Sequence, residues 1–172
     1  MEVEAYNTLQ DLQGKHIPQF YSAVTVPTSS FALDHEFSKY ANSPGILIQY
    51  ISWFSLGDIA LHAPKYQWQS ICEEDMKIVH LYTAKGVRNN DVRPRNMIVH
   101  ISPRGKFRIF MIDFGCCAFR RQARSEWDWW DMKADRDEEG VIGYFMENHL
   151  KEGFVYRRFE FYRNLNKKYK TY

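Results

Sequence analysis

The chain has 172 residues, of which 45% are hydrophobic and 16% are aromatic, and its formal net charge is +2. This composition is too rich in core-forming side chains for a disordered protein, and the length suits one domain with a buried core. A net charge this close to zero gives no strong signal for nucleic-acid or membrane binding.

Cysteine and histidine usage excludes further classes of protein. Cys72, Cys116 and Cys117 are too few for a disulfide framework, and no apolar leader opens the chain, so we expect a soluble cytoplasmic protein. The longest apolar run, 46–54, is too short to span a bilayer. The six histidines occur singly, so no zinc motif is predicted.

The first predicted element is an amphipathic helix over residues 2–14, which ends at Gly14. Its inner face, at 3.6-residue spacing, is formed by Ala5, Tyr6, Leu9 and Leu12. Glu2 falls on this same face, whereas Glu4 points to the opposite side. A carboxylate aimed inward is therefore the unusual feature of this helix.

Strands and two helices are predicted next. Segments 17–26 and 29–33 have the pattern of strands, and the apolar, β-branched run 45–52 predicts a buried strand. A short helix begins at 55–60, and a longer helix covers 68–86. The apolar stripe of the longer helix consists of Trp68, Ile71, Cys72, Met76, Val79 and Thr83.

The second half of the chain predicts a β-hairpin and another helix. Segments 97–102 and 107–113 flank a Pro-Arg-Gly turn, which is typical of a hairpin, and 137–151 predicts a helix despite two glycines. The acidic and aromatic segment 121–137 has no clear period, and the basic, aromatic tail predicts a solvated terminal helix. No repeat or linker divides the chain, so one domain over 1–172 is expected.

Polar residues flank the hairpin in an order that predicts a metal and phosphate site. Asp91 follows the long helix, Asn96 lies at the mouth of the hairpin, and Asp113 ends its second strand. The hairpin folds Asn96 and Asp113 toward each other, and an amide oxygen with a carboxylate suits Mg²⁺. Asp91 is then free to accept a proton from an attacking hydroxyl, and Arg93 adds positive charge near the transferred phosphate.

The motifs DVRPRN (91–96) and IDFG (112–115) resemble the catalytic-loop and magnesium motifs of the protein-kinase-like superfamily. The stretches LQGKHIP, GVRNNDVRPRNMIVH and DEEGVIGY are more closely similar to fungal kinase-like domain proteins. The resemblance implies an α+β protein-kinase-like fold, with a partial small lobe and hinge over 1–52 and a mostly helical large lobe over 53–172. It also implies ATP and Mg²⁺ as cofactors.

Roles for single residues also follow from the resemblance. It implies that Asp91 is the catalytic base and that Arg93 contacts the γ-phosphate. Asn96 and Asp113 would hold Mg²⁺. The nucleotide would also contact residues of the hinge and of the magnesium motif, namely Gln49, Tyr50, Ile51, Phe114 and Gly115.

Two further acidic residues receive structural roles from the resemblance. Glu2 matches the helix glutamate that pairs with the lysine of the small lobe, and its inward position favours it over Glu4. Asp137 matches the buried aspartate that opens the next large-lobe helix and braces the catalytic loop.

The chain departs from the family pattern in three places. No Gly-rich loop and no Val-Ala-Ile-Lys strand precede the first helix, so Glu2 has no lysine partner upstream. Asn89 and Asn90 stand where the family has His-Arg, which disfavours control by a phosphorylated activation loop and leaves open what packs beneath Asp-Phe-Gly. No Ala-Pro-Glu lies between Asp113 and Asp137, which favours a small-molecule substrate or none.

These observations together predict an ATP- and Mg²⁺-dependent phosphotransferase that transfers a γ-phosphoryl group to a hydroxyl of a protein or small molecule. The missing parts predict impaired activity for this chain alone. Three accounts stay open: a truncated active protein, a pseudokinase, and an atypical enzyme that takes its lysine from elsewhere. The alternative function is a catalytically inactive pseudokinase that acts as an interaction or nucleotide-binding module.

Two other features have both a structural and a functional interpretation. The Trp-rich segment 127–133 predicts packing against the large lobe, with a surface for a protein partner as the alternative. Cys116 predicts a small apolar filler, with a reactive thiol beside the nucleotide as the alternative.

Overall fold

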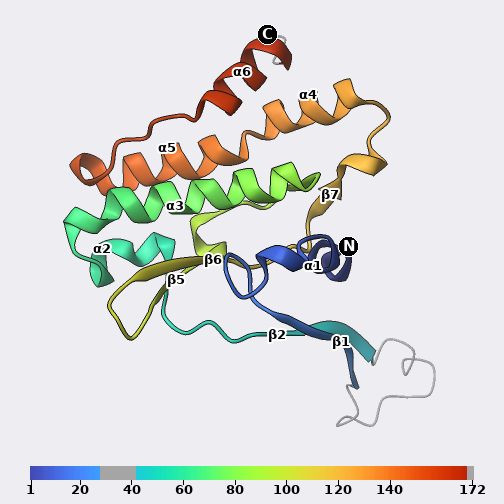
Figure 1. Cartoon of the computed structure of the whole chain (residues 1–172), viewed down its shortest axis with the longest axis horizontal. Helices are drawn as coiled ribbons and strands as arrows, with labels where there is room; N and C mark the ends of the chain where they lie inside the picture. Colours follow the sequence, from blue (N-terminus) through green and yellow to red (C-terminus); the bar gives the residue numbers. More distant parts are fainter. Residues whose placement is uncertain (28–41, 170–172) are drawn as a thin grey trace.

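The structure is a computed structural model, and it describes residues 1–27 and 42–169. The fold is α+β: a layer of helices packs beside a β-hairpin, and a two-stranded ribbon lies on the other side of the hairpin (Figure 1). The strand predicted at 29–33 lies outside the described residues.

The helices of the described residues include both predicted and unpredicted elements. They are α1 (Glu2–Thr8), α2 (Ile59–His62), α3 (Lys65–Ala84), α4 (Glu126–Arg136), α5 (Glu138–Leu150) and α6 (Glu160–Tyr169). Short 3-10 turns include η1 (Gln10–Leu12), η3 (Leu56–Asp58) and η4 (Pro94–Asn96). Helix α4 was not predicted, and it begins where the Ser125 hydroxyl accepts a hydrogen bond from the Asp128 N–H at 3.0 Å.

The strands pair only in antiparallel fashion within the described residues. They are β1 (Phe20–Pro27), β2 (Asn42–Ile48), β3 (Phe54–Ser55), β4 (Val87–Asn89), β5 (Met97–Ile101), β6 (Phe107–Met111) and β7 (Cys117–Phe119). Strand β1 pairs with β2, β5 lies between β3 and β6, and β4 pairs with β7. The predicted hairpin is confirmed, because Met97 pairs with Met111 and Ile101 with Phe107.

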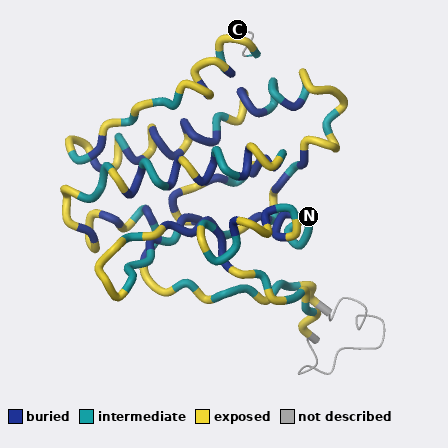
Figure 2. The backbone as a smooth tube through the Cα atoms, viewed as in Figure 1, coloured by how far each residue is buried: buried dark blue, intermediate teal, exposed yellow. Residues whose placement is uncertain are grey.

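A continuous core connects the first helix to the last. It contains the inner face of α1, the hairpin, α3 and α5, and it extends to Tyr162 and Leu165 of α6. Figure 2 shows the buried residues between the helix layer and the hairpin. Helix α6 is therefore not wholly solvated, since its apolar side packs on this core.

The β1–β2 ribbon corrects the prediction of a buried strand over 45–52. Strand β2 ends at Ile48, and Leu47 is 54% exposed. Ile46 and Ile48 pack against the core, so only one side of the ribbon is covered. Among the described residues no further strand pairs with either outer edge of this ribbon. A two-stranded ribbon has no second layer to bury both faces, which explains the difference.

The Trp-rich segment lies mainly in α4, and the structural interpretation holds for Trp129, which is 1% exposed. Trp127 is more exposed and packs on Tyr169 of α6, with ring centroids 4.8 Å apart. Among the helices of the described residues, none is both long enough and apolar enough to cross a membrane.

Candidate active site

The loop between β4 and β5 holds Asp91 and Asn96 together. Pro94 opens the turn η4, where its fixed φ is compatible with a helical start. The Asn96 side-chain amide then donates to the Asp91 carbonyl oxygen at 3.0 Å and lies 3.5 Å from Oδ2 of its carboxylate. This bond orients the amide, so Oδ1 of Asn96 has no donor among the described residues and can serve as a ligand.

Asp113 follows the end of β6 after one intervening residue, Ile112. The Ile112 N–H donates to the Asn96 carbonyl oxygen at 2.9 Å, which extends the hairpin pairing by one step. Asp113 then turns out of the sheet with a left-handed φ of 63°, and it is exposed. Its Oδ1 accepts a hydrogen bond from the Gly115 N–H at 3.3 Å. Asp113 therefore lies one residue beyond the backbone pair of Ile112 and Asn96, at the end of the hairpin.

Asn89 connects this loop to the Asp-Phe-Gly segment (113–115), and it is the side chain that packs beneath that segment. Its side-chain oxygen accepts from the Asp91 N–H, and its amide donates to the Asp113 carbonyl oxygen, both at 2.9 Å. The Asn90 N–H also donates to the Cys116 carbonyl oxygen at 3.0 Å, next to the pairing of β4 with β7. A buried asparagine thus fixes the spacing of Asp91 and Asp113, a role that the sequence did not indicate.

Glu138 makes the contact with the loop that was predicted for Asp137. The Asp137 carboxylate instead caps α5, where it accepts from the Gly140 N–H at 3.1 Å, and it pairs with Arg158. Glu138 is 1% exposed, and its Oε1 accepts from the Asn89 N–H and from the Tyr82 hydroxyl, both at 2.8 Å. Asp137 therefore opens the helix as predicted, whereas the contact with the loop is made by Glu138.

A buried ion pair completes the support below the loop. Lys133 of α4 pairs with Oε2 of Glu138, and both side chains are fully or almost fully buried. Burial lowers the pKa of Lys133, and the charge of Glu138 opposes this change. Burial and the nearby Glu138 both raise the pKa of Tyr82. The Glu138 carboxylate thus satisfies three donors from three different parts of the chain.

Glu2 reaches the magnesium motif from α1. Its carboxylate accepts a hydrogen bond from the Phe114 N–H at 3.2 Å, across 112 positions of sequence. Glu2 is half-buried, and it forms no ion pair with a lysine or arginine of residues 1–27 or 42–169. The inward direction predicted for Glu2 agrees with this contact, and its acidic group lies next to the motif that contains Asp113.

An aromatic column runs from the ribbon through α1 to the magnesium motif. Tyr6 stacks on Phe20 with ring centroids 5.5 Å apart, and it meets Phe114 edge-on at 5.6 Å. Phe114 meets Tyr82 of α3 at 6.4 Å. Burial raises the pKa of Tyr6, and the charges of Glu2 and Asp113 add to this effect. The column holds α1, which carries Glu2, against Phe114, which is the residue after Asp113.

Arg93 lies at the mouth of the site and pairs with Asp91. Its Nε lies 2.5 Å from Oδ1 of Asp91, and its side chain is 53% exposed. Arg95 is more distant, with Nη2 4.0 Å from Oδ2 of Asp91. Because Arg93 uses Nε for this contact, its terminal Nη groups are available to an anion at the mouth.

The predicted hinge follows β2. The backbone N–H of Gln49 donates to the Gln19 carbonyl oxygen at 2.7 Å, so this donor is not available to a base. Tyr50 is 87% exposed, and Ile51 is half-buried. The backbone groups of Tyr50 and Ile51 form no backbone hydrogen bond with another described residue, so they are the accessible ones.

The donor set at the end of the hairpin fits Mg²⁺ only if other ligands are present. In the part of the chain that the structure describes, no group of three or more His, Cys, Asp or Glu residues could hold a metal ion. Asn96 and Asp113 offer one amide oxygen and one carboxylate, which are hard ligands of the kind Mg²⁺ uses together with waters and phosphate oxygens. The pair therefore suits a metal that arrives with a nucleotide.

Comparisons with known proteins assign no family and no function to this chain. No model of a known protein family matches the chain, and no curated protein matches its sequence. Any function for the site must therefore be argued from its own residues.

Proposed function

We propose that this chain is a kinase-like phosphotransferase domain that binds ATP with Mg²⁺ and transfers the γ-phosphoryl group to a hydroxyl. The observation that supports it best is a convergence: Asp91, Asn96 and Asp113 are connected through Asn89 and the end of the hairpin. Glu2 joins them from the distant helix α1. In this proposal the ribbon and α1 belong to a partial small lobe, and the helices to a large lobe.

The roles of the site residues follow from their contacts. Asn96 and Asp113 hold the metal, and a bound Mg²⁺ would neutralise charge on the phosphate oxygens. Asn89 and Asn96 hold the Asp91 backbone through its N–H and its carbonyl oxygen, and the Asp91 carboxylate accepts the proton of the attacking hydroxyl. Arg93 directs its terminal nitrogens at the phosphate that is transferred.

The adenine side of this site would be the segment after β2. Because the Gln49 N–H is used by Gln19, the base would contact the backbone groups of Tyr50 and Ile51. Phe114 and Gly115 follow the metal ligand Asp113, and their backbone holds the end of the phosphate region in place.

A second candidate function is a nucleotide-binding module without transfer activity. Two observations favour it. Glu2 has no cationic partner among the described residues, and Arg93 is paired with the very carboxylate that would act as base. Phosphoryl transfer depends on positioned positive charge, so a site with fewer cations is expected to turn over slowly.

Thermal unfolding with excess ATP, with and without Mg²⁺, tests nucleotide binding. Ligand at a hundred times its Kd stabilises by about 2.7 kcal/mol, and each kcal/mol raises the Tm by roughly 2–4 °C in a chain of this size. The shift should require Mg²⁺, disappear in Asp113→Asn, and persist in Asp135→Asn, a matched change at an exposed position of α4. The absence of a Mg²⁺-dependent shift in the native protein would contradict the proposal.

Turnover of ATP distinguishes the two candidate functions. Phosphorus NMR should detect slow conversion of ATP by the native protein, reduced about 10²–10⁴-fold in Asp91→Asn while nucleotide binding is retained. Binding without any turnover, equal in both proteins, would instead support the module without transfer activity.

A further inference from the structure

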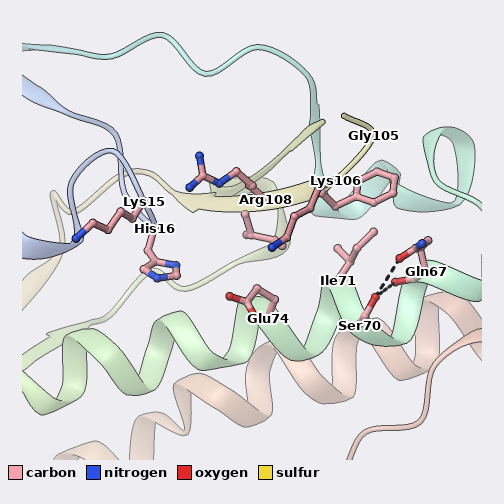
Figure 3. Close-up of a pocket in the computed structure, with 11 residues that line it drawn as sticks. Lys15, His16, Gln67, Ser70, Ile71, Glu74, Gly105, Lys106 and Arg108 are labelled. Carbon is pink, nitrogen blue, oxygen red and sulfur yellow. Dashed lines mark hydrogen bonds between the residues drawn. The ribbon is translucent and has the colours of Figure 1, made fainter. Parts of the chain in front are cut away.

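A hollow of about 510 Å³ lies between the hairpin, the loop after η1 and the first half of α3, and it shares no residue with the candidate active site. Figure 3 shows the side chains of the three segments meeting around it. It is lined by Lys15, His16, Gln67, Ser70, Ile71, Glu74, Gly105, Lys106, Phe107, Arg108 and Ile109. Its volume falls within the range of small-molecule sites, which is about 300–1,000 Å³.

The walls of this hollow are fixed by backbone hydrogen bonds. The Met111 N–H of β6 donates to the His16 carbonyl oxygen at 2.9 Å, which joins the loop to the hairpin. The His16 N–H in turn donates to the Leu12 carbonyl oxygen at 2.9 Å. Phe107 is half-buried and supplies apolar surface to the lining, whereas Ile71 and Ile109 are each only 2% exposed. The hollow is therefore a formed site with an apolar part.

Positive charge predominates around the hollow. Three cationic side chains, Lys15, Lys106 and Arg108, line the hollow together with one carboxylate, Glu74, so three minus one leaves +2. Oε2 of Glu74 already lies 3.1 Å from Lys77, and neither Lys106 nor Arg108 forms an ion pair within residues 1–27 and 42–169. The charges of the hairpin are thus not neutralised by the described protein.

His16 lies at the same part of the hollow as Lys15, and its pKa is lowered mainly by burial. Glu74 opposes this effect on the pKa, and Arg108 and Lys15 add to it. The opposite end of the hollow is polar but uncharged, since the Ser70 hydroxyl donates to the Gln67 carbonyl oxygen at 2.9 Å. One end of the hollow therefore suits an anion, and the other suits a neutral hydrogen-bonding group.

We propose that this hollow binds a small molecule with a phosphate group, which lies against Lys106 and Arg108 while an apolar or planar body lies on Phe107. A phosphate monoester carries about −1.5 to −2 charges at neutral pH, which matches two adjacent cations. The apolar surface adds binding free energy in proportion to the area that it covers. The site does not depend on the proposed phosphotransfer function.

Isothermal titration with phenyl phosphate, in buffer without Mg²⁺, tests this site. The protein carries Arg93→Gln throughout, which removes the cation that the candidate active site offers to a phosphate. We expect saturable binding that weakens at least tenfold in Lys106→Gln/Arg108→Gln. The matched control is Arg104→Gln/Arg124→Gln, which removes the same charge from two exposed arginines outside the hollow and should leave the affinity unchanged.

Three results would overturn the proposal. Binding of phenyl phosphate without saturation, or an equal loss of affinity in both double variants, would indicate general charge attraction. Inorganic phosphate could also bind as tightly as phenyl phosphate, which would exclude a role for the apolar surface. Thermal unfolding of each variant in the absence of ligand should match that of the parent, because all four substituted side chains are exposed.

Discussion

Two polar regions lie on either side of the loop that contains Asp91. They differ in whether their acceptor atoms receive hydrogen bonds from the protein. Below the loop is a buried cluster whose donors all meet one carboxylate, and it consists of Tyr82, Asn89, Lys133 and Glu138. Above the loop, Oδ1 of Asn96 and Oδ2 of Asp113 accept no hydrogen bond from the described residues. Asn96 is buried and Asp113 is exposed. Buried polar groups that are satisfied hold structure, whereas acceptors that lack a protein donor can bind a ligand.

The largest expected effect on stability comes from breaking the buried cluster. Glu138→Gln removes the charge that Lys133 needs, and a buried cation left unpaired costs about 3–5 kcal/mol. Urea unfolding measures this loss. Glu126→Gln, at an exposed ion pair with Arg120, is the control and should leave the free energy of unfolding almost unchanged.

A double-mutant cycle makes the same test more specific. Lys133→Met in the Glu138→Gln background removes the uncompensated charge, so the two changes together should cost less than the sum of the single changes. Additive losses would mean that Lys133 and Glu138 stabilise the fold independently.

Asp75 of α3 belongs to neither region and is expected to have the next largest effect. It is fully buried, both carboxylate oxygens are without a partner among the described residues, and burial raises its pKa well above 3.8. The folded state therefore binds this proton more tightly than the unfolded chain. The stability that results is present below about pH 4 and is lost as the pH rises through the folded pKa.

Asp75→Asn should remove this pH dependence and stabilise the protein at pH 7 by about 1–3 kcal/mol. The free energy of unfolding, measured in urea from pH 4.5 to 7.5, should decline more steeply for the native protein than for the variant. The lowered pKa of His16 acts in the opposite direction in both proteins, so the difference between them isolates Asp75. Parallel pH curves would refute the assignment.

Asp113 should respond to backbone geometry more than to charge. Its left-handed φ of 63° is tolerated by asparagine but costs alanine roughly 1 kcal/mol or more. Asp113→Ala should therefore be less stable than Asp113→Asn by about 1 kcal/mol, although both lack the carboxylate. Equal stability of the two variants in urea unfolding would show that the turn relaxes.

The smallest effect is expected at the surface pair of Arg121 with Glu4, which joins the segment after β7 to α1. Both side chains are substantially exposed, so Arg121→Gln should change the free energy of unfolding by less than about 0.5 kcal/mol. A loss comparable to that of Glu138→Gln would contradict the distinction between buried and exposed polar groups.

The elements with a clear hydrophobic period could be predicted from the sequence. The inner face of α1, the stripe of α3 and the hairpin repeat at 3.6 or 2 residues, and burial follows these periods. The hairpin also brought Asn96 and Asp113 to the same end, as its turn predicted. Strand β2 has an apolar run without a period, and such a run does not reveal how many faces are covered.

The support of the site could not be predicted in the same way. Asp137 and Glu138 are adjacent acidic residues, and which one faces the loop depends on the left-handed φ of 44° at Asp137, where α5 begins. Asn89 gives no periodic signal, and its two hydrogen bonds reach residues 2 and 24 positions away. Such contacts are set by tertiary packing, which a local pattern does not contain.

The open ribbon has a consequence for handling the protein in solution. Strands β1 and β2 pair with each other, and no other described strand covers their outer edges. Unpaired N–H and C=O groups beside apolar side chains such as Leu47 are a template for pairing with another chain. Pro44 removes one donor from β2 but leaves Ile46 to Ile48 open. Concentrated samples are therefore expected to self-associate through this edge, and a lysine in place of Leu47 should keep them monodisperse.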